Sequence, residues 1–193
     1  RDYTDMEIIG STRDDAAGEC FDKTARVLGL PYPGGKPIDE LAQGGDDSKY
    51  VFPIGHVEGH PYDMSFSGLK TATLNLIHHA QQIGEDLDIN SLCAGFSKSV
   101  SDTLVPRVVR ALQETGRDKI AVAGGVAANS RIRNDILSAA EKLGVAVYMP
   151  PLSLCGDNGA MIGAQAYYEY LAGNTAGMEL NAYATKSILG ESL

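Results

Sequence analysis

Residues 119–133, KIAVAGGVAANSRIR, decide the fold of this chain, because they join an apolar run, two glycines and the start of a helical pattern. The run at 119–123 is typical of a buried strand, and the glycines form the turn into a helix predicted from about 128 to 143. The strand signal returns at 145–149, and a last helix is predicted over 157–171. Strand, helix, strand and helix with short links predict a parallel α/β layer with right-handed crossovers.

The chain upstream of this layer is predicted to be mainly helical. Apolar periodicity and turn residues predict a strand over 4–10, helices over about 13–28 and 67–82, and a short helical stretch through Ile38 and Leu41. Asn90 or Asp88 is predicted to open a third long helix, which runs toward Gly116. Thr12, Ser67 and Asp157 stand at positions typical of helix N-caps, and Pro106 predicts a kink in the third long helix. Residues 44–65 are rich in Gly, Pro and charge, which indicates a long functional or mobile excursion.

Composition places the 193-residue chain among ordinary folded domains, with 44% hydrophobic and 21% charged residues. This balance excludes disorder and is typical of a soluble enzyme or binding module. A formal charge of -9 repels phosphate backbones, so a nucleic-acid substrate requires another surface or subunit to hold it. The sequence contains no run of about 18 apolar residues, so a membrane span is not predicted.

Three cysteines, Cys20, Cys93 and Cys155, are odd in number and lack metal-ligand spacing. They predict free thiols in a reducing compartment, and the cytoplasm is the expected location. The first residues do not resemble a signal peptide, and the sequence does not begin with Met, so we expect a fragment of a longer chain.

Two strand-to-helix junctions are the first candidate sites. Gly124 and Gly125 let a ligand approach the backbone closely, which suits a nucleotide, but a tight turn needs the same small residues. Asp157, in the motif CGDNGA at 155–160, is explained by capping alone, and a carboxylate there can also ligate a metal or orient a phosphate. Both junctions lie at the carboxyl ends of predicted parallel strands, where open α/β sheets bind ligands.

Three other patterns have both a functional and a structural interpretation. His56 and His60 have the spacing of a helical metal pair, but the flanking glycines and proline weaken a helix there. Residues 65–71, SFSGLKT, offer two hydroxyls and a lysine at a helix start, either as an anion site or as a cap beside a solvated lysine. Residues 14–23 crowd four carboxylates beside small residues, and we expect one or two of them to be functional.

Four motifs in this order, DDAAGECFDKTARVLGLPYPGG, SFSGLKT, AGGVAANSRIR and DNGAMIG, resemble the family of TsaD, the tRNA threonylcarbamoyladenosine transferase once called O-sialoglycoprotein endopeptidase or glycoprotease. The resemblance runs over nearly the whole chain. It implies an actin-like, Hsp70-like ATPase (ASKHA) fold with two lobes around a nucleotide cleft. Residues 1–193 would form the C-terminal lobe, an α/β lobe with an incomplete mixed sheet flanked by helices and a helical insertion over about 44–116.

The resemblance implies a reaction and the residues that serve it. The family transfers the threonylcarbamoyl group from threonylcarbamoyl-adenylate to N6 of adenosine 37 in tRNAs that read codons starting with A. By this resemblance, the residues that contact the adenylate are Asp22, Gly35, Asp39 and Asn129, and Asp157 gives one ligand to a divalent metal, iron or zinc. The metal would polarise the threonylcarbamoyl group, so no covalent enzyme intermediate is required, and no further catalytic residue is assigned.

The resemblance also implies what this sequence lacks. The family's histidine pair, which completes the metal site, and a Ser-Gly-Gly-His-Thr loop near the phosphates belong to an N-terminal half, so we expect little activity from this chain alone. The expected partners are tRNA and TsaB-like and TsaE-like proteins, with no membrane. By resemblance the middle strands of the sheet are also missing, and we expect an upstream segment or self-association to close the gap.

Two other functional classes stay open. A metallopeptidase, the older family label, needs a metal-activated water and a general base, and the sequence contains no HExxH motif. A non-catalytic interaction module is indicated by the acidic charge and by a predicted exposed sheet edge.

Overall fold

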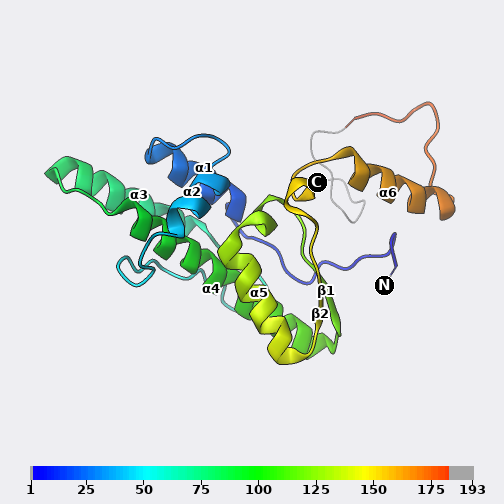
Figure 1. Cartoon of the computed structure of the whole chain (residues 1–193). Coiled ribbons are helices and arrows are strands. Elements are labelled where there is room, and N and C mark those ends of the chain that lie inside the picture. The colour runs from blue at the N-terminus through cyan, green and yellow to red at the C-terminus, as the bar shows by residue number, and fades with distance from the viewer. Residues whose placement is uncertain (1, 183–193) are drawn as a thin grey trace. The chain divides into compact units, whose positions relative to one another are not determined.

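The computed structural model describes residues 2–182, and residue 1 and residues 183–193 lie outside the described part. The chain divides into two compact units, Gly10–Gly156 and a second unit made of Arg1–Ile9 and Asp157–Leu193. Figure 1 shows the elements of both units. The lobe predicted over 1–193 includes residues outside this description, and its helical insertion over about 44–116 stays a prediction.

A two-stranded parallel sheet forms the α/β layer of the larger unit. β1, Lys119–Ala121, pairs with β2, Ala146–Tyr148, and Ile120 lies opposite Val147. The helix α5, Ser130–Leu143, follows β1 and precedes β2, as the alternating strand and helix signals predicted. Ile120 and Val147 are half-buried and their strand neighbours are exposed, so one face of the sheet is turned toward the core. The parallel α/β layer is therefore confirmed, with each strand shorter than predicted.

The strand predicted over 4–10 is wrong. Within the described residues this segment contains no strand, and Ile8 and Ile9 are about half exposed, at 51% and 49%. A strand persists when a neighbour satisfies its backbone groups, and in residues 2–182 β1 and β2 pair only with each other. Closure of the sheet by an upstream segment or by self-association stays a prediction.

Helices build the rest of the larger unit. They are α1 (Ala17–Val27), α2 (Gly35–Ala42), α3 (Ser67–Ile83), α4 (Ile89–Thr115) and α5, with two short 3-10 turns, η1 (Gly125–Ala128) and η2 (Leu152–Leu154). α4 is central, because residues on all its sides are buried between Ser91 and Thr103, and it lies against α2 and α5 (Figure 1). The rings of Phe21 on α1 and Phe96 on α4 meet edge to face, with centroids 5.0 Å apart. The predicted helices are confirmed as elements.

Two of the predicted caps are wrong, because their hydroxyl groups have other partners. Thr12 Oγ donates to the backbone carbonyl of Asp15 at 2.8 Å, and α1 begins only at Ala17 rather than near Arg13. Ser67 lies inside α3, and its Oγ donates to the carboxylate of Asp15 at 2.7 Å. The contact of Thr12 is local, whereas that of Ser67 joins segments 52 positions apart in the sequence.

α4 begins after Asp88, one of the two residues predicted to open it. Asp88 caps it by accepting a hydrogen bond from the backbone N–H of Ser91 at 3.2 Å. Hydrogen bonds from Ser91 and Lys49 lower the pKa of Asp88 to about 2. Pro106 lies inside the helix, and the kink there stays a prediction. Every helix in the described part of the chain, α4 included, is too short or too polar to cross a lipid bilayer.

The excursion over 44–65 is fixed to α4. Arg107 donates hydrogen bonds to the backbone carbonyls of Gly55 and Asp63, which lie at either end of one loop. These bonds satisfy carbonyl groups that have no ladder partner, so a segment without regular structure keeps a defined path. A function for this excursion stays a prediction.

The second unit contains α6, Gly159–Leu171, which buries none of its residues. Asn158 has extended backbone angles and caps α6 by accepting a hydrogen bond from the backbone N–H three residues on, at 3.1 Å. The cap predicted at Asp157 is therefore wrong by one residue. The ring of Tyr3 stacks on that of Tyr168, with centroids 3.6 Å apart, so the N-terminal segment packs on α6.

We expect Gly95→Ala to lower the free energy of unfolding by about 1–3 kcal/mol, because overpacking strains a closed contact. A Cβ at Gly95 would lie 2.2 Å from the backbone oxygen of Tyr50, so the excursion would have to move away from α4. Urea unfolding monitored by circular dichroism measures this loss. The matched control is Gly68→Ala in α3, where a Cβ meets no atom within 4 Å, and there we expect a gain of about 0.5–1 kcal/mol. Equal stability of the two variants would contradict the prediction.

Candidate functional site

The loop after β1 delivers a buried asparagine to the start of α5. Gly124 has a φ of 92°, which a glycine adopts at little cost, and the chain turns there from β1 into η1. Asn129 then caps α5, with its Oδ1 accepting from the backbone N–H of Ile132 at 3.1 Å. Asn129 is 6% exposed, and its Nδ2 has no hydrogen-bond partner among the described residues. A buried donor without a partner is costly, so this amide is a candidate to donate to a ligand.

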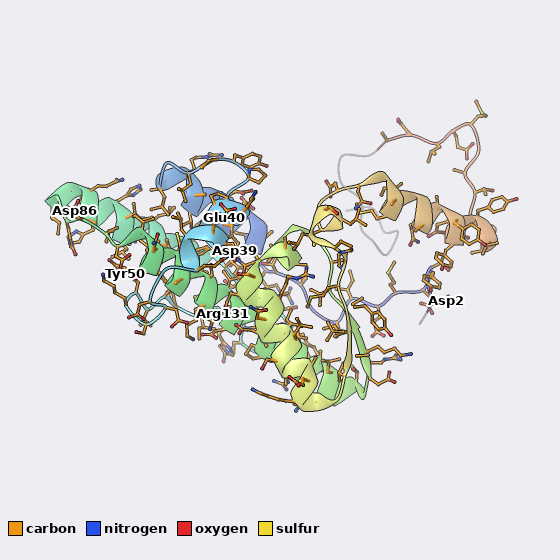
Figure 2. All side chains as sticks on the ribbon, in the orientation of Figure 1. Asp2, Asp39, Glu40, Tyr50, Asp86 and Arg131 are labelled. Carbon is orange, nitrogen blue, oxygen red and sulfur yellow. The ribbon has the colours of Figure 1, made fainter. Side chains whose placement is uncertain are left out.

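Asp39 fixes α2 to the same end of α5. Its Oδ1 accepts hydrogen bonds from the backbone N–H of Ser130 at 3.0 Å and from Ser130 Oγ at 2.8 Å. These bonds join residues 91 positions apart and hold Asp39 beside the Asn129 cap. Sequence reasoning missed Ser130, because only the folded chain brings it to Asp39. In Figure 2 Asp39 is labelled on α2 and Arg131, the residue after Ser130, on α5.

Asp22 shapes the entrance to α2. Its Oδ1 accepts a hydrogen bond from the backbone N–H of Gly34 at 2.7 Å. Gly34 is closely packed, since a Cβ there would lie 2.4 Å from the Cβ of Ala25, whereas a Cβ on Gly35 would meet no atom within 4 Å. One glycine therefore lets α1 and α2 approach each other, and the next presents open backbone at the first residue of α2.

Four of the five predicted site residues share this corner of the larger unit. Asp22 lies on α1, Gly35 and Asp39 lie on α2, and Asn129 precedes α5, with Asp22 and Asp39 bonded to backbone at the start of α2 and of α5. Their assignment to an adenylate stays a prediction. Asp157 belongs to the second unit, where it is exposed at the residue before the α6 cap.

A cavity of about 340 Å³ opens between α2, α4 and α5. Its walls include Asp39 from α2, Ala94 and Ser97 from α4, and Arg131 and Asn134 from α5. Ser97 is 1% exposed, and no atom of the described residues forms a hydrogen bond with its Oγ. No sequence motif marks Ser97, because a buried hydroxyl without a partner is visible only once the helices have packed.

Two carboxylates compensate the positive charge of Arg131 at the edge of this cavity. Its Nη1 lies 2.6 Å from a carboxylate oxygen of Asp47, and its Nε lies 2.6 Å from one of Asp135. The hydrogen bond to Asp47, together with that to Asp135, raises the pKa of Arg131. The cavity therefore has an acidic balance, because Asp39 and Asp46 also line it.

The start of α3, interpreted from sequence either as an anion site or as a cap beside a solvated lysine, is occupied by carboxylates of the same chain. Asp14 accepts from the backbone N–H of Phe66 at 2.8 Å and of Ser67 at 3.3 Å. Asp15 accepts from Ser67 Oγ and forms an ion pair with Lys70. The hydrogen bond from Lys70, with those from Ser67 and Lys23, holds the pKa of Asp15 far below its usual range. These two carboxylates therefore join α1 to α3, and Lys70 is not a solvated lysine.

The histidine pair at 56 and 60 lies outside any helix. His56 is exposed, and His60 Nδ1 lies 3.2 Å from a guanidinium nitrogen of Arg13 and 3.7 Å from a carboxylate oxygen of Asp63. The sequence predicted that the flanking glycines and proline weaken a helix here, and the structure confirms this, because residues 56–60 form no helix. Within residues 2–182 no group of three or more His, Cys, Asp or Glu side chains is arranged to hold a metal ion.

The three cysteines are free thiols, as predicted. All three are buried, and burial raises the pKa of Cys20 and of Cys93 to about 12. The thiolate is the reactive form, so neither of these two side chains serves as a nucleophile near neutral pH.

Comparison with known proteins settles the family. The sequence model of TsaD, described as tRNA N6-adenosine threonylcarbamoyltransferase, matches residues 1–164. This chain belongs to the TsaD family. A relative named tRNA N6-adenosine threonylcarbamoyltransferase from Moorella thermoacetica is 48% identical over 181 residues, which are 94% of this chain and 53% of the relative. One of the same name from Latilactobacillus sakei subsp. sakei is 51% identical over 179 residues, 92% of this chain and 52% of the relative.

The TsaD-family chain thus spans about half the length of the curated relatives it matches, at 53% and 52%. Among solved structures, the crystal structure of T. kodakarensis HypF superposes with a TM-score of 0.58 at 20% identity, covering 83% of this chain and 20% of that chain. At this identity the likeness concerns the fold alone. The resemblance inferred from the four motifs is therefore confirmed at the level of the family.

We expect Asp15→Asn to lower the free energy of unfolding by about 1.5–3 kcal/mol at pH 7, because Lys70 then loses a charged partner. The pKa of Asp15 is depressed in the folded chain, so its contribution is complete above the unfolded value of about 3.9 and is lost as the pH falls toward the folded value. Denaturant titrations from pH 7 down to acid should show the two proteins converging below about pH 4.

The matched control for this variant is Glu19→Gln. Glu19 pairs with Lys23 at 2.5 Å, but its side chain is 49% exposed, so its removal should change stability little. If the difference in free energy of unfolding between wild type and Asp15→Asn does not narrow in acid, the ionic contribution of Asp15 is excluded.

Proposed function

We propose that this TsaD-family chain is the adenylate-holding half of a tRNA N6-adenosine threonylcarbamoyltransferase. The observation that carries the proposal is the buried Asn129 amide without a described partner, beside the anchored Asp39 carboxylate and the open backbone at Gly35. Family membership supplies the reaction class. We further propose that the chain is the C-terminal lobe of an actin-like, Hsp70-like two-lobed fold, and the likeness to HypF supports a shared α/β fold.

Each residue of this corner has a binding role in the proposal. Asn129 Nδ2 donates to the nucleotide, and the carboxylates of Asp22 and Asp39 accept from hydroxyl or amino groups. Gly35 lets the ligand approach the main chain at the start of α2. Because Asp22 and Asp39 are themselves held by backbone N–H groups, the site is ordered before the ligand arrives, which reduces the entropic cost of binding.

The reaction then needs orientation more than a nucleophilic side chain. The N6 amino group of the tRNA adenosine attacks the carbonyl carbon of threonylcarbamoyl-adenylate and forms the new N–C bond. The bond from that carbon to the phosphate oxygen breaks, AMP leaves with the electron pair, and N6 gives up a proton. Cys20 and Cys93 play no part, because both are buried thiols of high pKa.

A metal is part of the proposal, but the described residues do not fit a complete site. Asp157 offers one exposed carboxylate, and a divalent iron or zinc ion needs about three protein ligands in a catalytic site. We propose that Asp157 gives one ligand and that the others come from the part of the relatives' length that this chain does not span. No step of the reaction is therefore derived through the ion.

The partners follow from the charge and from the family. A formal charge of -9 requires another surface to bring tRNA to this chain, and we propose the missing half together with TsaB-like and TsaE-like proteins. The cytoplasm, where tRNA is modified and thiols stay reduced, is the proposed location.

We expect residues 1–193 alone to modify unmodified tRNA no faster than background when given threonylcarbamoyl-adenylate and TsaB-like and TsaE-like partners. Addition of the N-terminal half of the Moorella thermoacetica relative should restore transfer, measured as modified nucleoside by mass spectrometry. Ready modification by the chain alone would contradict the proposed division of the site.

The matched pair Asp39→Asn and Glu40→Gln makes this assay specific. Asp39→Asn keeps an oxygen for Ser130 but removes the charge, and we expect a loss of about 10–100-fold in transfer, the worth of a hydrogen bond to a charged group. Glu40 is an exposed neighbour on α2, labelled in Figure 2, and Glu40→Gln should leave transfer unchanged.

We expect Asp157→Ala to lower metal affinity at least about tenfold in the reconstituted protein, since loss of an outer-shell partner alone costs about 10–100-fold. Elemental analysis of iron and zinc, with circular dichroism to confirm folding, measures this effect. Glu141→Gln, at an exposed position of α5, is the control. Unchanged metal content in Asp157→Ala would remove this residue from the ligand set.

A further inference from the structure

We propose that Arg133 is a positioning residue for the candidate site, because its side chain ties the loop after β2 to the loop after β1 and so fixes the orientation of Asn129. This inference rests on the proposed function, since it takes Asn129 as a residue that binds the adenylate. Arg133 lies on α5, one turn after the Asn129 cap, and its backbone N–H donates to the carbonyl of Asn129 at 3.0 Å.

The guanidinium of Arg133 donates to the chain at both strand-to-helix junctions. A long side chain on a helix points back toward the helix N-terminus, and here it reaches η1, where Nη1 donates to the carbonyl of Ala127 at 2.8 Å. Nη2 donates to the carbonyl of Pro150 at 3.3 Å, in the loop that follows β2. One side chain therefore bridges the two loops at the carboxyl ends of the parallel strands.

A buried thiol lies at the same bridge. Sγ of Cys155 lies 3.7 Å from Nη1 of Arg133, and it donates to the carbonyl of Pro151, also at 3.7 Å. Cys155 is 4% exposed, so this end of the bridge is shielded from water. Hydrogen bonds from a charged donor are strong in such a place, so the guanidinium holds the loop firmly.

Two consecutive prolines explain why the loop after β2 needs a side-chain bridge. Pro150 and Pro151 have no backbone N–H, so neither can donate to a neighbouring strand. The side chains of Arg133 and Cys155 donate to the carbonyl of Pro150 instead. The path of this loop therefore depends on the Arg133 side chain and not on strand pairing.

The position of Arg133 is unfavourable for a positive charge, which indicates that its shape matters. The first turn of α5 carries the positive end of the helix dipole, where a cation is disfavoured. Arg131, in the same turn, is paired with carboxylates, whereas the side-chain partners of Arg133 in the described part of the chain are two carbonyl oxygens and a thiol. A lysine would carry the same charge, but only the planar guanidinium offers several donors in a rigid fork. The variant Arg133→Lys therefore separates shape from charge.

Asn129 is the residue that this bridge orients. Ala127, two residues before it, is held by the guanidinium, and the Asn129 carbonyl accepts from the backbone N–H of Arg133. The direction of the buried Asn129 Nδ2, which has no partner among the described residues, is thus set from both sides by one residue. A binding group that is misplaced by about 1 Å loses much of its effect, so loss of the bridge should weaken ligand binding.

The first measurement needs no ligand. Leu154 and Cys155 have backbone N–H groups that donate within the loop, to Pro151 and Leu152, and hydrogen–deuterium exchange read by mass spectrometry follows them. We expect these groups to exchange at least about tenfold faster in Arg133→Lys than in wild type, because the loop opens locally. Peptides from α4 should exchange as in wild type.

The matched control for this exchange is Arg110→Lys. Arg110 lies on α4 and is about half exposed, and its Nε lies 2.7 Å from a carboxylate oxygen of Glu114. The same chemical change there leaves both strand-to-helix junctions untouched, so exchange in the loop after β2 should equal that of wild type.

The second measurement is a double-mutant cycle on AMP binding to the chain, measured by calorimetry. Asn129→Ser keeps an oxygen that can cap α5 but removes the Nδ2 donor. We expect Arg133→Lys and Asn129→Ser each to weaken AMP binding about three- to tenfold, as the loss of one hydrogen bond does. Because Arg133 acts through Asn129, Arg133→Lys should cause no further loss in the Asn129→Ser background, whereas a general loosening would weaken binding equally in both backgrounds.

Five results would each overturn the inference. They are unchanged exchange in the loop after β2, faster exchange throughout α4, AMP affinity of Arg133→Lys equal to that of wild type, equal losses in the two backgrounds, and no saturable AMP binding to wild type.

Failure of the proposed function is distinguishable from these results. If the reconstituted protein does not modify tRNA but exchange and the double-mutant cycle give the expected results, Arg133 still positions Asn129 for a nucleotide. If transfer occurs and Arg133→Lys transfers and binds AMP like wild type, the proposed function stands and the positioning role does not.

Discussion

The burial of α4 is the constraint on which the larger unit depends. Through Thr103 this helix has buried residues on every side, so each neighbour must supply a surface that fits it. α2 and α5 pack against it, the ring of Phe21 meets that of Phe96 edge to face, and Arg107 holds the long excursion by its carbonyl groups. The candidate site is a product of this packing, because α2 and α5 must both lie on α4 before Asp39 can reach Ser130.

The parts of the fold that sequence analysis predicted are those that local periodicity determines. The apolar runs in 119–123 and 145–149 and the helical pattern between them are sufficient to specify β1, α5 and β2. The strand predicted over 4–10 rested on a short apolar core, but a strand also needs a partner strand, and pairing is not a local property. The cap predicted at Ser67 failed for a related reason, since the carboxylate of Asp15, from a distant segment, accepts a hydrogen bond from its hydroxyl.

The residues of the candidate site also fall into two groups, those that sequence motifs indicate and those whose role appears only in the folded chain. Family motifs indicated Asp22, Gly35, Asp39 and Asn129, and the structure explains why such residues occur there: two hold backbone at helix starts, one opens the main chain and one is a buried cap. The roles of Ser97, Ser130 and Arg131 could not be found in this way. Ser97 has an unpaired hydroxyl, Ser130 donates to Asp39, and Arg131 is ion-paired with Asp47. Each of these properties arises only when elements that are far apart in the sequence pack together.

The two cysteines of the core give the chain an internal reporter. Cys20 on α1 and Cys93 on α4 are fully buried. Cys20 precedes Phe21, and Cys93 lies one helical turn before Phe96, whose ring meets that of Phe21. Alkylating reagents need access to the sulfur and a thiolate. In the folded chain both sulfur atoms are buried, and their raised pKa keeps them protonated. Labelling of either thiol therefore proceeds only through molecules in which that helix has separated from the core, and its rate under native conditions measures how often α1 and α4 open.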